Sequence, residues 1–328
     1  MRLSGLAVVT LVLVFAAAIG GAAAQTAPQV YRVGLLAVGP DPTDQSPFGV
    51  GLIRGFAGGG FVLGKNLVFV RYAAHGHVEQ LPHLVHELVA DKVAVIITQG
   101  YPAAVAAKDY SSLPIVVVQA GDPVEDGLVS SFARPGGRVT GISEIAAELS
   151  AKRLALLKGA VPSVHRVAML WNADDLGMSL RYKAAEAQAR SLGIEVESLG
   201  VRAPNDFDAA FAAMVRKPPD AILMVSDALT TLNRKRVIDF AAAHKVPAIY
   251  EYDFLVREGG LMSYGPDVSE MFGRAAGLAV RVLKGASPAD LPLEEPSRFV
   301  LAINLGTAKA TGLTIPPSLL ARADDVIE

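Results

Sequence analysis

Three segments in the first half of the chain recur, in the same order, in its second half. YRVGLLAVG (31–39), VAVIITQG (93–100) and LPIVVVQA (113–120) correspond to HRVAMLWNA (165–173), DAILMVSD (220–227) and VPAIYEYD (246–253). The offsets of 134, 127 and 133 residues are far longer than the repeats of about 20 to 50 residues that build solenoids. The chain is therefore expected to hold two similar lobes, and the cleft between them is a natural place for a ligand.

Each half alternates short apolar runs with helical patterns. Strands are expected near residues 32–38, 67–72, 93–98, 115–119 and 137–141 in the first half, and near 166–171, 195–201, 221–225, 248–252 and 260–264 in the second. The runs are rich in Val, Ile and Leu without polar alternation, which is typical of parallel strands covered on both faces. This order predicts the α/β class, with two similar doubly wound, Rossmann-like parallel-sheet lobes joined by a multi-strand hinge.

The pattern also predicts domain boundaries. Residues 1–24 have the layout of a signal peptide, since a basic start and an apolar run end in small residues at Ala24. A membrane anchor is the alternative, which the shortness of the apolar run disfavours. Lobe 1 is expected to comprise residues 28–140 plus about 266–290, and lobe 2 residues 141–265 plus about 291–328. The proline-rich connector at 285–296 lies within a tail that should cross between the lobes more than once.

Composition narrows the classes of function. The chain has no cysteine, which excludes disulfides, thiol chemistry and a lipid-bearing cysteine at the cleavage site. Its 30 basic and 32 acidic residues form no basic stripe of the kind that binds nucleic acid or a membrane surface. We therefore expect a protein exported to the periplasm through a cleavable signal peptide, not lipidated, with no nucleic-acid partner.

Motifs for catalysis are incomplete. GGFVLGKN (59–66) resembles a phosphate-binding loop, but Asn66 replaces the hydroxyl residue that binds magnesium. Around Ser263 the nucleophile pattern GxSxG fails because Leu261 stands at its first glycine. No carboxylate-rich partner sequence completes a zinc site with the four histidines between residues 75 and 86. The sequence predicts no enzyme activity, no metal and no cofactor.

Ligands of open α/β sheets bind outside the carboxyl ends of the strands, often over helix N-termini. Applied to both lobes, this rule predicts a mixture of aromatic faces, glycine-exposed amides and polar side chains. The candidate ligand-binding residues are Phe48, Gln99, Gly100, Tyr101, Gly121, Asp122, Trp171, Asn172, Ser226, Asp227, Tyr250, Tyr252 and Tyr264. For each of them a helix-capping or core role is the structural alternative.

Two candidates carry specific expectations. Asp227 directly follows a buried strand, so its carboxylate should either cap the next helix or meet a ligand cation. Trp171 is the single tryptophan and could stack on a flat ligand. For an amino acid, backbone amides after Gly100 or Gly121 would hold the carboxylate, and Asp227 would hold the ammonium.

Three longer segments resemble a known family. GDPVEDGLVSSFARPGGRVTGIS (121–143), GGLMSYGPD (259–267) and INLGTAKATGLTIPPSLLARADDVIE (303–328) are similar to signature segments of a branch of periplasmic substrate-binding proteins of ABC transporters. The resemblance covers essentially the whole mature chain. It implies the type I periplasmic-binding-protein fold with three hinge crossings, and a trapped solute that is tryptophan, tyrosine or phenylalanine in some members.

The chain also departs from this family in two places. FGVGLIRGFAGGGF (48–61) stands where FxxGLRELGY is common, and Tyr101 stands where small residues are more usual. The resemblance alone therefore does not identify the solute.

The chain is interpreted as the exported solute-binding component of an ABC uptake transporter. It would capture a small organic solute, with an amino acid or an aromatic compound favoured, by closure of its lobes. Its partners would be that solute and a membrane ABC permease with its ATPase, and it is expected to be a monomer. Two alternatives stay open: a periplasmic ligand-sensing module that feeds a receptor, and a periplasmic hydrolase.

Overall fold

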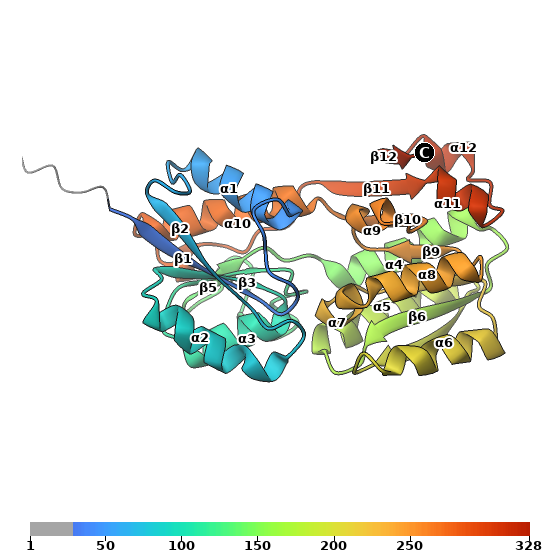
Figure 1. Ribbon diagram of the computed structural model, residues 1–328, viewed down its shortest axis with the longest axis horizontal. Helices are drawn as coiled ribbons and strands as arrows, with labels where there is room; N and C mark the ends of the chain where they lie inside the picture. The colour runs from blue at the N-terminus through green and yellow to red at the C-terminus, as the bar shows by residue number, and fades with distance from the viewer. Residues whose placement is uncertain (1–28) are drawn as a thin grey trace, which may run out of the picture.

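A computed structural model describes residues 29–328. The expected signal peptide, residues 1–24, lies outside the described residues. Figure 1 shows two α/β lobes side by side, connected by several segments of the chain. No helix within residues 29–328 has the length and apolarity that a membrane span requires.

Lobe 1 is built on a parallel sheet with the strand order β2-β1-β3-β4-β5. Its strands are β1 (Tyr31–Ala37), β2 (Leu67–Ala73), β3 (Val95–Gln99), β4 (Ile115–Val118) and β5 (Val139–Gly141), and its helices are α1 (Pro47–Gly58), α2 (Leu81–Ala90), α3 (Tyr101–Tyr110) and α10 (Val268–Leu283). Helices α1 and α10 cover one face, where Phe56 and Phe272 are buried. Helices α2 and α3 cover the other, where Leu88 and Ala104 are buried.

Lobe 2 is built on a sheet with the order β12-β11-β10-β9-β8-β6-β7. Its strands are β6 (Arg166–Asn172), β7 (Glu195–Val201), β8 (Ala221–Met224), β9 (Ala248–Tyr250), β10 (Met262–Pro266), β11 (Phe299–Asn304) and β12 (Asp325–Ile327). Its helices are α4 (Ala146–Ala160), α5 (Leu176–Ser191), α6 (Asp206–Arg216), α7 (Ala228–Leu232), α8 (Arg234–Ala243), α9 (Asp253–Arg257), α11 (Leu305–Ala310) and α12 (Pro317–Leu320). The pair β10 and β11 is antiparallel, and the other pairs are parallel.

The strands are buried because they consist of apolar side chains with helices on both faces. Every residue of β4 and β8 is buried, as expected for parallel strands without polar alternation. All ten strands expected from the sequence are present, with boundaries shifted by up to two residues. The sequence analysis missed β11 and β12, which lie in the tail that it left unassigned.

Gly51, which matches the family pattern, and Gly55, which departs from it, allow α1 and α10 to pack closely. A Cβ atom on Gly51 would lie 2.3 Å from the carbonyl oxygen of Ser269, and one on Gly55 would lie 2.3 Å from that of Gly273. Real Cβ contacts are never so short, so any larger residue here would push the helices apart. These glycines therefore shape the α1–α10 contact, and they do not line the cleft.

The chain passes between the lobes at three places. Residues 142–145 connect β5 to α4, residue 267 connects β10 to α10, and the segment after residue 294 leads into β11. The crossing segments pair with each other, since Ile142 bridges Glu294 and the Asp267 N–H donates to the Arg298 carbonyl. Leu291 and Leu293 pack in the lobe 1 clusters, so we propose to extend lobe 1 from about 290 to about 294 in the division predicted above.

Candidate ligand-binding site

A cavity of about 850 Å³ lies between the lobes, where the carboxyl ends of both sheets face each other. Lobe 1 lines it mainly with the segments that follow β1, β3 and β4, and lobe 2 with those that follow β6, β7 and β8. A cavity of this size matches the sites that enclose small organic molecules.

The lobes touch across the mouth of this cavity. A Cβ atom on Gly76 of lobe 1 would lie 3.1 Å from a methyl group of Leu232 in α7 of lobe 2. Gly76 and Leu232 both line the cavity. The structure therefore shows the lobes drawn together.

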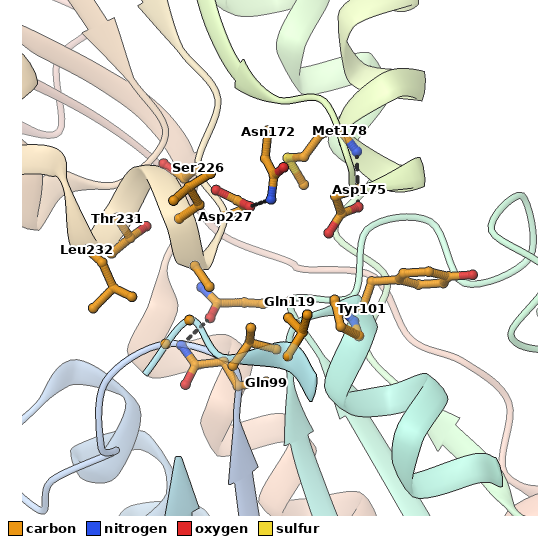
Figure 2. A pocket seen from close by; sticks show the side chains of 18 of the residues that line it. Gln99, Tyr101, Gln119, Asn172, Asp175, Met178, Ser226, Asp227, Thr231 and Leu232 are labelled. Atoms are coloured by element: carbon orange, nitrogen blue, oxygen red, sulfur yellow. Dashed lines mark hydrogen bonds between the residues drawn. The ribbon is translucent and has the colours of Figure 1, made fainter. Parts of the chain in front are cut away.

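Nine of the residues expected from the sequence line the cavity. They are Phe48, Gln99, Gly100, Tyr101, Gly121, Asn172, Ser226, Asp227 and Tyr252. Figure 2 shows Gln99, Gln119 and Tyr101 on the lobe 1 side and Asn172, Asp175, Ser226 and Asp227 on the lobe 2 side. The rule that places ligands beyond the carboxyl ends of parallel strands brings these residues together.

Asp122 and Tyr250 do not line the cavity, contrary to the sequence expectation. The Asp122 carboxylate accepts hydrogen bonds from the backbone N–H groups of Ala146 and Ala147 at 3.2 and 3.3 Å, so it caps α4 of the other lobe. Tyr250 is completely buried in the core of lobe 2, because it is still part of β9 and its side chain points into the sheet's helical cover.

Trp171 and Tyr264 also lie away from the cavity. The Trp171 ring stacks on Tyr182 with a centroid distance of 5.0 Å, and its Nε1 donates to the hydroxyl of Ser198 at 2.9 Å. Tyr264 stacks on Phe299 of the neighbouring strand. Both side chains pack on the core cluster that α4 and α5 cover, so the expected stacking of Trp171 on a ligand is wrong for this arrangement.

The lobe 2 wall presents two carboxylates that cap helices. Asp227 Oδ1 accepts from the Thr230 N–H at 2.8 Å at the start of α7, and its Oδ2 accepts from Asn172 Nδ2 at 2.5 Å. Asp175 Oδ1 accepts from the Gly177 N–H at 2.8 Å at the start of α5. Burial, with a contribution from the Asp227 charge, raises the pKa of Asp175. The capping role considered for Asp227 is thus present, and both carboxylates still line the cavity.

The lobe 1 wall offers an uncapped helix. No side chain among residues 29–328 caps the N-terminus of α3, and Gly100, Tyr101 and Pro102 line the cavity. The first N–H groups of a helix lack partners within the helix and carry a partial positive charge. At the other predicted loop, the Asp122 N–H already donates to the Asp126 carboxylate. Of the two anion positions expected from the sequence, the one after Gly100 is therefore the freer.

A buried network of charges supports the cavity from behind. Arg181 Nη2 donates to Glu144 at 3.1 Å, Arg181 Nη1 donates to both oxygens of Glu251, and Arg153 donates to Glu251 at 2.7 Å. These four side chains are at most 3% exposed. The Tyr252 hydroxyl donates to Glu144 at 2.7 Å. Because Glu144 lies in the first crossing segment and Tyr252 lines the cavity, the network joins the ligand cleft to the hinge.

This network sets the ionisation of its members. Burial raises the pKa of Glu144, and the Arg181 charge opposes that shift. Burial opposes the charge of Arg181, but Glu251 and Glu144 outweigh it and raise the pKa of Arg181. The sequence analysis missed these residues. The available signal was that Arg181 shares the buried stripe of α5 with Met178, Ala185 and Ala189, where a charged residue needs a partner.

Asp126 is a second residue that the sequence analysis missed. It is 5% exposed, its Oδ1 has no hydrogen-bond partner among the described residues, and its Oδ2 accepts from the Asp122 N–H at 3.2 Å. It lies on lobe 1 but faces lobe 2, since a Cβ atom on Gly177 would be 3.5 Å from its Oδ2. Burial and the charge of Asp122 raise the pKa of Asp126 to about 7. A buried carboxylate thus stands at the junction of the lobes.

The four histidines between residues 75 and 86 do not converge in the structure. His75 and His77 line the mouth of the cavity, whereas His86 packs against Tyr110 in lobe 1. Within residues 29–328, no group of three or more His, Cys, Asp or Glu side chains is arranged to hold a metal ion.

Comparison with known proteins identifies the family to which this two-lobed protein belongs. Residues 46–327 match the family model of the ABC transporter substrate binding proteins. The chain belongs to this family, and its two parallel-sheet lobes are those of a type I periplasmic binding protein.

Particular relatives are similar over most of their length. The chain is 28% identical to a tyrosine-binding protein of Clostridioides difficile (strain R20291) over 262 residues, which cover 79% of this chain and 75% of the relative. A structure of an ABC domain from Streptococcus pneumonia in complex with L-Trp superposes with a TM-score of 0.83 at 26% identity, covering 91% of this chain and all of the other. A conserved domain protein from Vibrio cholerae gives a TM-score of 0.84 at 24% identity, with the same coverage.

Proposed function

We propose that this protein is the exported solute-binding component of an ABC uptake transporter, and that it captures a small organic solute by closing its lobes. An amino acid or an aromatic compound is the favoured class of solute. The observation that carries the proposal is the cavity between the lobes, with an uncapped helix N-terminus on one wall and two carboxylates on the other. The tyrosine and tryptophan in the names of the similar proteins support this class.

The geometry suits a zwitterion. An α-carboxylate would accept hydrogen bonds from the N–H groups of Tyr101 and Ala103 at the start of α3, where the helix dipole also favours an anion. Pro102 has no N–H group, and that of Ala104 already donates to the Gly100 carbonyl. An ammonium group would meet Asp227 and Asp175 on the opposite wall. Phe48 and Tyr252 line the same cavity and provide apolar surface for a side chain.

Closure then follows from differential affinity. A solute that contacts both walls does so only when the lobes are together, so it stabilises the closed state by the free energy of the contacts that exist in that state alone. A membrane permease with its ATPase would recognise the closed form, and the binding protein would act as a monomer in the periplasm.

The decisive experiment uses the mature chain from residue 25. Native mass spectrometry would identify a co-purified solute, and the protein would then be unfolded, refolded and screened by thermal shift against amino acids and aromatic acids. We expect at least one of these to raise the melting temperature. A refolded protein that none of them stabilises would contradict the favoured class of solute.

A charge-neutral variant tests the role of the lobe 2 wall. Asp227→Asn keeps a good N-cap residue for α7 but loses the charge, so affinity for an amino acid should fall by about 2 to 5 kcal/mol. Asp220→Asn is the matched control, because the exposed Asp220 accepts the backbone N–H groups of His165 and Arg166, and none of these residues lines the cavity. Equal binding by both variants and the unmodified protein would remove Asp227 from the proposal.

A further inference from the structure

The two walls of the cavity differ in charge. The lobe 2 wall carries Asp175 and Asp227, and its nearby arginines are already paired, Arg181 with the buried glutamates and Arg202 with Asp174 at 2.9 Å. An ammonium group is therefore attracted to this wall, and no arginine there is free to hold an anion.

The lobe 1 wall is apolar apart from a few groups. Among the described lining residues from 38 to 121, the side chains of His75 and His77 are 57% and 63% exposed, which places them at the mouth. The Tyr101 hydroxyl donates to the Asp126 carbonyl at 3.1 Å and so points out of the cavity (Figure 2). The polar side chains that remain on this wall are the amides of Gln99 and Gln119.

These two amides are joined to each other and only partly used. Gln99 Nε2 donates to Gln119 Oε1 at 2.9 Å (Figure 2). Gln99 Oε1 and Gln119 Nε2 have no hydrogen-bond partner among the described protein groups, and neither atom is sealed from the cavity. Each carboxamide has two donor hydrogens and one acceptor oxygen, so the Gln99 oxygen and three donor hydrogens of the pair remain for a solute.

The backbone of Gln119 is strained in this position. Its φ of 53° is left-handed, a conformation that costs a residue with a Cβ atom roughly 1 to 2 kcal/mol. Such outliers persist where the surrounding structure determines them and often occur at ligand sites. Here the strained residue follows β4 and its amide lies on the cavity wall beside Gln99.

We propose that Gln99 and Gln119 select the solute by hydrogen-bonding a neutral polar group at the end away from its cation. The solute class is then an organic cation or zwitterion whose far end carries a phenol hydroxyl, an indole N–H or a carboxamide. A solute with a purely apolar far end leaves both amides without partners when closure excludes water, and unpaired buried polar groups cost free energy. This inference rests on the proposed function and goes on to name what the cavity discriminates.

The test measures binding of probe pairs that differ in one polar group. The pairs are L-tyrosine and L-phenylalanine, tyramine and 2-phenylethylamine, and L-tryptophan and 3-(1-naphthyl)-L-alanine, each titrated by calorimetry into the refolded protein. In every pair whose members bind, the polar member should bind about 10-fold more tightly, as one net hydrogen bond of about 1.4 kcal/mol gives.

Variants assign the discrimination to the two amides. Gln119→Leu and Gln99→Leu should bring the affinity ratio within each pair close to one, because the polar member loses a hydrogen bond and the apolar member no longer leaves that amide unpaired. Gln188→Leu on α5, outside the cavity, is the matched control and should keep the full ratio. Gln119→Gly removes the amide and the backbone strain together, so it tests the same ratio if a leucine variant fails to fold.

The outcomes separate this inference from the proposed function. An unchanged ratio in the Gln119 and Gln99 variants, or equal binding of the members of each pair by the unmodified protein, overturns the inference and leaves the proposed function standing. Failure of all six probes to bind overturns the proposed class of solute and the inference with it.

Discussion

The buried carboxylate at the junction of the lobes gives a prediction about pH. Asp126→Asn keeps the size and shape of the side chain and removes its ability to ionise. Asp126 faces the carboxylates of Asp122 and Asp175 and the guanidinium of Arg181, so its ionisation is opposed by burial and two like charges and favoured by one opposite charge.

The sign and size of the effect follow from linkage. The pKa of Asp126 is raised from 3.8 to about 7 in the folded protein. Below about pH 4 the carboxyl is protonated in both the folded and the unfolded chain, so it adds no pH dependence. As the pH rises towards 7, only the unfolded chain releases this proton, and the free energy of unfolding therefore falls. A shift of about three units corresponds to at most about 4 kcal/mol above pH 7.

Lobe opening would relieve part of this cost. An opened cleft exposes Asp126 to water without unfolding either lobe, so some of the penalty should appear as opening above pH 7. Small-angle X-ray scattering of the apo protein would then give a larger radius of gyration at pH 8 than at pH 5.5, and Asp126→Asn should remove this difference.

The assay compares both proteins by thermal or urea unfolding from pH 4 to 8. The asparagine variant should match the unmodified protein near pH 4 and exceed its stability near pH 8. Parallel stability curves across this range would refute the reasoning, since they would show that the Asp126 carboxyl ionises alike in the folded and unfolded chains.

Two further substitutions probe the supports of the cleft. Arg181→Met leaves the buried glutamates without their shared partner and should lower the free energy of unfolding in urea by about 3 to 5 kcal/mol. Arg190→Met, on the exposed face of the same helix, is the control and should lower it by less than about 0.5 kcal/mol. Similar losses of stability in both variants would contradict a role for the network. Gly76→Ala should speed solute release in stopped-flow measurements, because the new Cβ atom meets Leu232 across the closed mouth. Gly60→Ala controls for backbone strain alone, since Gly60 has a φ of 91° and open space around it. Equal release rates for the two variants would show that the contact between residue 76 and Leu232 does not control release.

The lobes and most of the cavity wall could be predicted because local patterns determine them. Continuous apolar runs identify buried parallel strands, and the residues that follow such strands at their carboxyl ends must share one edge of the sheet. Gln99, Asn172 and Asp227 were found in this way. The rule failed for Tyr250 and Trp171 because it does not give the direction of a side chain: Gln99 and Asn172 also end their strands, but the pleat turns Tyr250 and Trp171 into the helical layers.

The charged residues behind the cavity could not be predicted in the same way. Glu144 and Arg181 are 37 residues apart, and Glu251 is another 70 residues beyond Arg181. Their pairing depends on how α4, α5 and β9 meet, which no local pattern reports. The N-terminus of α4 shows the same limit, because its cap, Asp122, comes from the other lobe.

The position of α10 has a consequence for how the chain acquires its fold. Phe272, Met271 and Ala276 complete one face of the lobe 1 sheet, although they follow β5 by more than a hundred residues. A ribosome that has released β1 to β5 has therefore made a sheet on which α1 alone covers the face that α1 and α10 share in the folded lobe. Such a sheet gains too little apolar burial to be stable alone. Lobe 1 should remain unfolded until nearly the whole chain has been synthesised, and the export proposed above would need such an unfolded chain.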